Sequence, residues 1–220
     1  MSAPKFRYIA CLACALSLVL LAGCSSTYYN TMEKFGVHKR DILVDRVEEA
    51  RDAQQEGQEQ FESALDQFKS VVQVEESELD AVYERLNSEY EGSRDAAESI
   101  RDHIDDVQSV AEALFSEWED ELDEYQDASL RRDSEAKLSV TRSKYKQLLA
   151  SMRNAEERIE PVLGTMHDQV LYLKHNLNAR AVQSLREEVI KIDYDVSRLL
   201  AAMREAIAEA NSFISDMRQG

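Results

Sequence analysis

Glycine and proline are scarce in this sequence of 220 residues, with 6 and 2 copies respectively. A fold rich in strands and tight turns needs these residues at its turns, so their scarcity argues against such a fold. Charged residues make up 31% of the chain and hydrophobic residues 44%. This composition is typical of long helices, and the hydrophobic share argues against a disordered chain.

Basic residues are few compared with acids: 26 Lys and Arg stand against 43 Asp and Glu, a formal net charge of -17. Residues 41–127 hold 29 acids and 6 bases, whereas residues 129–220 hold 13 acids and 15 bases. Nucleic-acid binding needs a basic surface, so we expect no nucleic-acid partner.

Cysteine is confined to the first 24 residues, where an apolar run at 9–21 follows the basic residues Lys5 and Arg7. The run is too short to span a bilayer comfortably and ends in Leu21-Ala22-Gly23-Cys24, which resembles a bacterial lipobox. The pattern predicts a lipoprotein signal peptide (1–23) that is removed and a lipid-modified Cys24. An ordinary signal peptide or an uncleaved anchor helix is the alternative.

Lipidation through Cys24 would hold the chain at a membrane, since several acyl chains give stable anchoring. The next residue is Ser25, where an Asp would commonly retain a lipoprotein in the inner membrane. By resemblance to such lipoproteins, we expect the periplasmic face of the outer membrane. Residues 24–30 would form a short tether.

Hydrophobic residues recur with a spacing of about 3.5 through almost all of the remaining chain, which is the pattern of packed helices. It predicts one domain at 31–220, an all-α elongated antiparallel bundle or coiled coil, with helices at about 31–72, 77–127, 132–175 and 179–218. We expect Asp133 and Asn178 to cap the last two helices and Pro161 to kink the third. A flatter set of hairpins or a partly intermolecular coiled coil is the alternative.

Charge favours one helix pairing in particular. The acidic end of the second helix precedes the basic start of the third, so folding back near Ser129 would place Glu121 beside Lys137 and Glu117 beside Arg142. Each exposed pair contributes only about 0.2–1 kcal/mol, but a series of them can select the partner helix.

Two sets of residues are candidates for contacts with other molecules. The end of the bundle nearest the lipid would carry a basic collar facing the headgroups; its residues are Lys34, Lys39, Arg40, Arg131 and Arg132. The loop between the last two helices holds Asn176, Asn178 and Arg180, which either cap the helices or form a docking site for a partner.

Motifs for chemistry are lacking. No Glu-x-x-His pair occurs, and His167 and His175 are too far apart along a helix to share an ion. The acidic stretch 117–127 lacks the Gly turn of a calcium loop, and no nucleophile elbow or phosphate loop is found. We therefore expect no enzyme activity, no metal and no cofactor.

Three segments carry a family resemblance: 38–50, the acidic stretch from Trp118 to Arg132, and 171–181. With the lipobox, they resemble the Gram-negative proteins called domain of unknown function 2959. The resemblance implies one helical domain and brings no activity or site residue. We expect a non-catalytic scaffold or adaptor with a protein partner or a homo-oligomer. The alternative is an envelope protein that binds cations or a lipophilic ligand.

Overall fold

The computed structural model describes residues 38–71, 79–176 and 179–219, and residues 179–182 through their backbone alone. This part of the chain contains helices and no strand. The helices are α3 (Lys39–Ser70), α4 (Leu79–Leu122), α5 (Ala128–Glu156), α6 (Ile159–His175) and α7 (Ala179–Gln219).

The hydrophobic repeat seen in the sequence becomes the core of the molecule. Every residue of the repeat in α7 from Leu185 to Met217 is buried, and so is the whole repeat in α3, including Gln54 and Gly57. These side chains form one continuous cluster with those of α4, α5 and α6. Burial of a Leu or Ile side chain contributes about 1.5–3 kcal/mol, so this repeat is the main source of stability.

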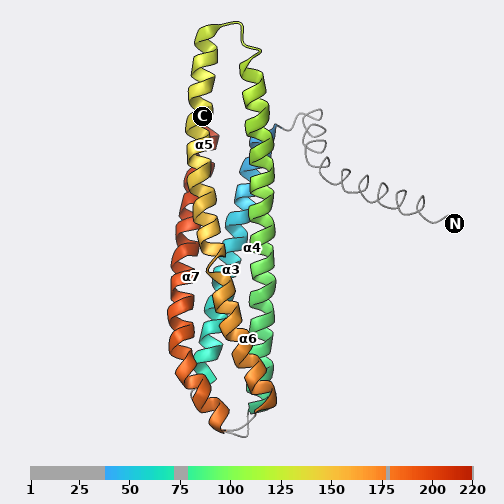
Figure 1. The fold of residues 1–220 in the computed structure, drawn as a ribbon, viewed down its shortest axis with the longest axis vertical. Coiled ribbons are helices and arrows are strands. Elements are labelled where there is room, and N and C mark those ends of the chain that lie inside the picture. Colours follow the sequence, from blue (N-terminus) through green and yellow to red (C-terminus); the bar gives the residue numbers. More distant parts are fainter. Residues whose placement is uncertain (1–37, 72–78, 177–178, 220) are drawn as a thin grey trace, which may run out of the picture.

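The helices form an elongated antiparallel bundle (Figure 1). Helix α3 packs on α4 and α7, while α5 and α6 follow one another along the opposite side and also pack on α4 and α7. Short connections make successive long helices antiparallel neighbours, which gives four positions in the bundle. The predicted fold class is therefore confirmed.

The third position in the bundle is occupied by two helices rather than by the single predicted helix at 132–175. Helix α5 ends at Glu156 and α6 begins at Ile159, with Pro161 in the first turn of α6. Proline has no N–H to donate, and its ring clashes with the carbonyl group four residues earlier, at Glu157. The predicted kink at Pro161 is thus a break just before it, where Arg158 N–H donates to the Ala155 carbonyl at 3.1 Å.

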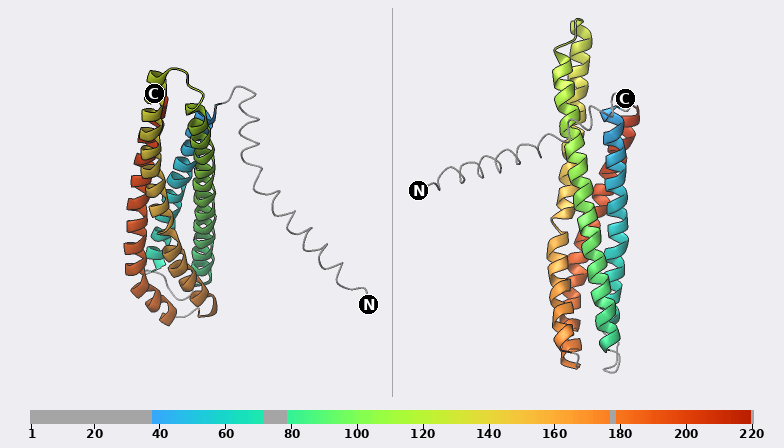
Figure 2. Two further views of the ribbon diagram at one scale, coloured as in Figure 1. Left: turned by 45° about the horizontal axis from the view of Figure 1, so that its top comes forward. Right: turned by 90° about the vertical axis from the view of Figure 1, so that its right-hand side faces the viewer.

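The hairpin of α4 and α5 extends past the start of α3 and the end of α7 (Figure 2). Helix α4 ends at Leu122, not near residue 127, and α5 begins at Ala128, not near residue 132. The N-cap of α5 is Asp127, whose carboxylate accepts from the Ser129 and Leu130 N–H groups at 2.7 and 3.2 Å. The prediction that Asp133 caps this helix was wrong.

Several predictions concern residues outside the described part of the chain. These are the signal peptide at 1–23, Cys24 and the tether at 24–30, the start of the first predicted helix at 31–37, Lys34 and Asn178. Among the helices that the structure does describe, none has the length and apolar character needed to cross a membrane.

Candidate functional site: the outer seam and the α4–α5 hairpin

The start of α3 is fastened to two other helices. Lys39 is only 3% exposed, and its Nζ contacts Glu117 Oε1 of α4 at 2.7 Å. The neighbouring Arg40 is half-buried and donates to the Met217 carbonyl of α7. A buried ammonium held by a carboxylate cannot face lipid headgroups, so Lys39 does not belong to the predicted basic collar.

The other described collar residues lie apart from Arg40. Arg131 and Arg132 are exposed at the tip of the hairpin, and Arg131 Nη2 contacts Asp123 Oδ1 at 2.9 Å across the turn. Because the hairpin projects beyond the start of α3, these two arginines and Arg40 lie at different heights along the bundle (Figure 2). The structure does not bring the predicted collar together as one ring.

Of the predicted docking loop, the structure describes Asn176, the C-cap of α6, and the backbone of Arg180 in the first turn of α7. The backbone N–H of Asn176 donates to the Leu173 carbonyl at 3.1 Å, and its Nδ2 donates to the Tyr172 carbonyl at 3.0 Å. These contacts belong to helix capping. Asn178 and the side chain of Arg180 lie outside the described residues.

A second repeat, alternating three and four residues, runs along the face where α4 meets α5 and α6. Most of its members are exposed or half-buried, while Phe115 and Leu163 are buried and join the core. We call this face the outer seam. Its residues form two parallel lines, one along α4 and one along α5 and α6. In α4 they are Arg94, Glu98, Arg101, Asp105, Gln108, Glu112, Phe115, Glu119 and Leu122; in α5 and α6 they are Arg132, Glu135, Ser139, Arg142, Lys146, Leu149, Arg153, Glu156, Glu160, Leu163 and His167.

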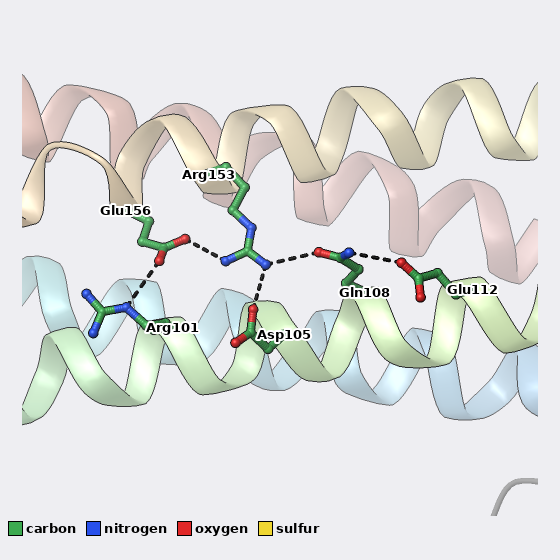
Figure 3. Close-up of polar contacts among 6 residues, drawn as sticks. All are labelled: Arg101, Asp105, Gln108, Glu112, Arg153 and Glu156. Carbon is green, nitrogen blue, oxygen red and sulfur yellow. Dashed lines mark hydrogen bonds and ion pairs between the residues drawn. The ribbon is translucent and has the colours of Figure 1, made fainter. Parts of the chain in front are cut away.

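The middle of the outer seam is a polar network around Arg153 (Figure 3). The Arg153 guanidinium contacts Asp105 Oδ1 at 2.6 Å and Gln108 Oε1 at 3.0 Å on α4, and Glu156 Oε2 at 2.7 Å on its own helix. Glu156, which is 16% exposed, also accepts from Arg101 Nε at 3.2 Å. Three hydrogen bonds of the network therefore join α4 to the last turn of α5.

Electrostatics keep Arg153 charged at its partly buried position. Burial by itself would lower its pKa, but the hydrogen bonds to Glu156 and Asp105 outweigh this effect and raise the pKa. A planar guanidinium with several donors suits such a fork of oxygen acceptors. The charged guanidinium holds the two helices together. Its nitrogen atoms only donate hydrogen bonds and cannot accept a proton.

Open grooves lie on both sides of this network. The upper one, which we call the hairpin groove, has a volume of about 410 Å³. Its lining residues are Glu119, Leu122, Glu135, Leu138, Ser139, Arg142, Ser143 and Lys146. The lower one has a volume of about 480 Å³ and lies between α4 and α6, where the Tyr90 and His167 rings meet at 5.3 Å.

The hairpin is held by polar contacts that differ in detail from the predicted ones. Arg142 Nη1 contacts Glu119 Oε1 at 2.6 Å, and its guanidinium lies 5.0 Å from the centre of the Phe115 ring. The hydrogen bond from Arg142 lowers the pKa of Glu119. Pairing of α4 with α5 was thus predicted correctly, but the proposed Glu117–Arg142 contact was wrong.

Lys137 is the second residue whose partner differs from the prediction. Its Nζ contacts Asp133 Oδ2 at 3.1 Å, four residues earlier on α5. On the inner side of the hairpin, Trp118 Nε1 donates to Ser134 Oγ at 2.8 Å. This bond fixes the register of the two helices beyond the end of the four-helix part.

Tyr145 is a buried titratable residue of α5 whose ring packs against that of Phe115 on α4. Burial, together with the nearby Glu112 carboxylate, raises the pKa of Tyr145 to about 12, so its hydroxyl stays protonated at neutral pH. Within the described residues, no three His, Cys, Asp or Glu side chains come together as a metal site.

The fold and its outer seam thus define a class: a long helical rod with a filled core, open polar grooves and a projecting hairpin. Residues 28–217 match a family described as a protein of unknown function, DUF2959, and the chain belongs to this family. No curated protein and no solved structure matches it.

Proposed function

We propose that this chain is a non-catalytic scaffold of the cell envelope that presents a rigid helical rod to a protein partner. In this proposal residues 1–23 are removed and Cys24 carries the lipid, at the periplasmic face of the outer membrane. The basic start, apolar run and lipobox of the sequence support the anchor. Several acyl chains on one residue would be enough for stable attachment.

The observation that carries the proposal is the projecting α4–α5 hairpin. Helix α4 has 44 residues and is therefore roughly 66 Å long. Its end is held to α5 by the Trp118–Ser134 and Asp123–Arg131 contacts, so the projection is stiff. A stiff projection with open polar grooves offers surface for docking, whereas a catalytic site usually lies in a concave, largely apolar pocket.

The anchor and the hairpin would share one end of the rod. The start of α3, the end of α7 and the hairpin lie at the same end of the bundle (Figure 2). Residues 25–38 separate Cys24 from α3, and such a segment spans at most about 50 Å. The proposal therefore directs the hairpin towards the membrane, and its partner is expected near the membrane surface.

Crosslinking in cells tests the proposal. A photoreactive residue at Ser139, in the hairpin groove, should give a discrete protein adduct, while the same residue at the exposed Ala208 of α7 should not. Cys24→Ala should release the protein from the membrane fraction, and Cys14→Ala should leave it there. Retention of Cys24→Ala on membranes, or equal adducts at both positions, would contradict the proposal.

A further inference from the structure

The charges of the outer seam are sorted by helix in the upper part of the molecule. Helix α4 carries acids there, and α5 carries most of the bases. Two acids, Glu112 and Asp120, and two bases, Arg132 and Lys146, are exposed and make no ion pair with any residue that the structure describes. Glu112 accepts a hydrogen bond from Gln108 Nε2 at 2.9 Å through one carboxylate oxygen, which leaves its other oxygen for a further contact (Figure 3).

The register of the hairpin places these charges in matching positions. The bond between Trp118 and Ser134 puts Asp120 level with Arg132, two residues further along the rod. The ring contact of Phe115 with Tyr145, at 5.3 Å, puts Glu112 level with Lys146 to within about one helical turn. Each unpaired acid on α4 thus has an unpaired base at its own height on α5.

Glu112, Arg132 and Lys146 lie on the face opposite the bundle, whereas Asp120 is only about 60° around α4 from Glu117 and lies on the flank of the hairpin. Glu117 reaches α3 and Lys144 reaches Asp216 of α7 at 2.7 Å, so both point inwards. Glu119 and Arg142 are each two residues away, about 200° around their helices, and line the hairpin groove on the outer side. No part of α3 or α7 lines this groove, so a second molecule can approach it freely.

We propose that the hairpin groove binds a second copy of the same chain, back to back, about a two-fold axis parallel to the rods. Rotation about this axis leaves the height of each residue along the rod unchanged and stacks α4 of one copy on α5 of the other. Glu112 then meets Lys146 of the second copy, and the symmetry makes this contact occur twice. Leu122 and Leu138 line the groove and supply its apolar surface.

Charge excludes the opposite arrangement of the two copies. A two-fold axis across the rods would stack α4 on α4 and α5 on α5, which brings like charges together. Like charges facing one another in an interface disfavour the complex. The parallel arrangement is also the one that two chains anchored in the same membrane can adopt, and in this respect the inference rests on the proposed function.

The contact is small. It runs over about 20 Å of two helices, and we estimate on the order of 500 Å² buried per copy, less than the ~800 Å² of a standard interface. A weak, salt-sensitive dimer follows, which becomes substantial when a shared membrane raises the effective concentration.

Reversed charges provide a test on the full chain, by sedimentation velocity in a density-matched neutral detergent. Lys146→Glu places two acids at each contact, and Glu112→Lys places two bases there. Each variant alone should lose at least tenfold in dimer affinity. A mixture of the two variants should recover it, because every contact then again joins an acid and a base. Pairing within one chain cannot produce this recovery.

The control is Arg204→Glu, an equal charge reversal at an exposed position of α7, which should dimerise as the natural chain does. Raising the salt from ~50 to ~500 mM should weaken the natural dimer, because exposed pairs are screened. A monomeric natural chain, dimers unaffected by the single reversals, or a mixture that does not recover would each overturn the inference. Binding of a different protein in the groove, and not of a second copy, would also overturn the inference. A chain that stays monomeric but gives the Ser139 adduct with another protein would leave the proposed function standing.

Discussion

Gln54 is the residue of the core whose replacement is most informative. It lies in the hydrophobic repeat of α3 with 0% exposure, and neither its Oε1 nor its Nε2 has a hydrogen-bond partner. A buried polar group without a partner costs about 1–3 kcal/mol. Leucine has a similar volume and no polar atom, so Gln54→Leu should remove this cost without leaving a cavity.

We expect Gln54→Leu to stabilise the protein by about 2 kcal/mol. For a domain of this size, a gain of 1 kcal/mol raises the melting temperature by about 2–4 °C, so the midpoint should rise by about 6 °C. Thermal and urea unfolding followed by circular dichroism measure both quantities. An unchanged urea m-value would show that the gain belongs to the folded state.

The control is the adjacent Gln55→Leu, an equal chemical change at an exposed position, which should alter stability by less than about 0.5 kcal/mol. If Gln54→Leu left stability unchanged or lowered it, the amide would be satisfied in solution, for example by a buried water, and the reasoning would be refuted. The expected gain also means that the natural chain retains an energetic cost in its core. A polar group at a core position of a helical bundle is known to fix register.

Three further changes test other parts of the fold. Gly57→Ala places a Cβ atom 2.6 Å from Ile100 Cδ1. The cost of this overpacking should exceed the gain in helix propensity, so the free energy of unfolding should fall by about 1 kcal/mol. Adding Ile100→Val, which removes the Cδ1 atom, should recover part of this loss. Glu117→Gln deprives the buried Lys39 of its carboxylate and should cost about 2 kcal/mol in the same measurement. Asp127→Ala removes the N-cap of α5 and should cost about 1 kcal/mol, with faster amide hydrogen exchange at the start of α5.

Each of these changes has a matched control. Gly164→Ala meets no atom within 4 Å and should stabilise α6 slightly, in contrast to Gly57→Ala. Asp123→Asn breaks an exposed pair with Arg131 and should cost less than 1 kcal/mol, as surface pairs do. Asp133→Ala should lose only the exposed contact with Lys137. Equal effects of a change and its control would contradict the corresponding argument.

The fold could be predicted because one physical signal dominates it. The hydrophobic repeat of α7 runs without a polar exception, and a helix is the only structure that gathers such a repeat on one face. The same repeat continues in phase from Ala155 to Ile159 and Val162, across the break at Pro161. Periodicity therefore indicated a single helix there, and only the geometry of the proline shows that the backbone hydrogen bonds are interrupted.

The outer seam was missed for a different reason. Its spacing is as regular as that of the core, but most of its residues are charged or polar, and a search for apolar repeats passes over them. A second repeat of charged residues with the same three-four alternation was the signal that could have found it. The burial of Lys39 could not be foreseen, because it depends on how far α4 and α7 extend relative to the start of α3.

The position of the Arg153 network explains how a rod with a broken helix keeps the register of its hairpin. At the break, α5 and α6 lose the hydrogen bonds that would make them one stiff element, so the end of α5 would otherwise fray. Arg153 and Glu156 lie in the last turn of α5 and hold it to Asp105, Gln108 and Arg101 of α4. Because α5 is fastened there, the break cannot shift it along α4. The alignment of charges along the hairpin therefore depends on contacts at the lower end of α5 as well as on the Trp118–Ser134 bond near the tip.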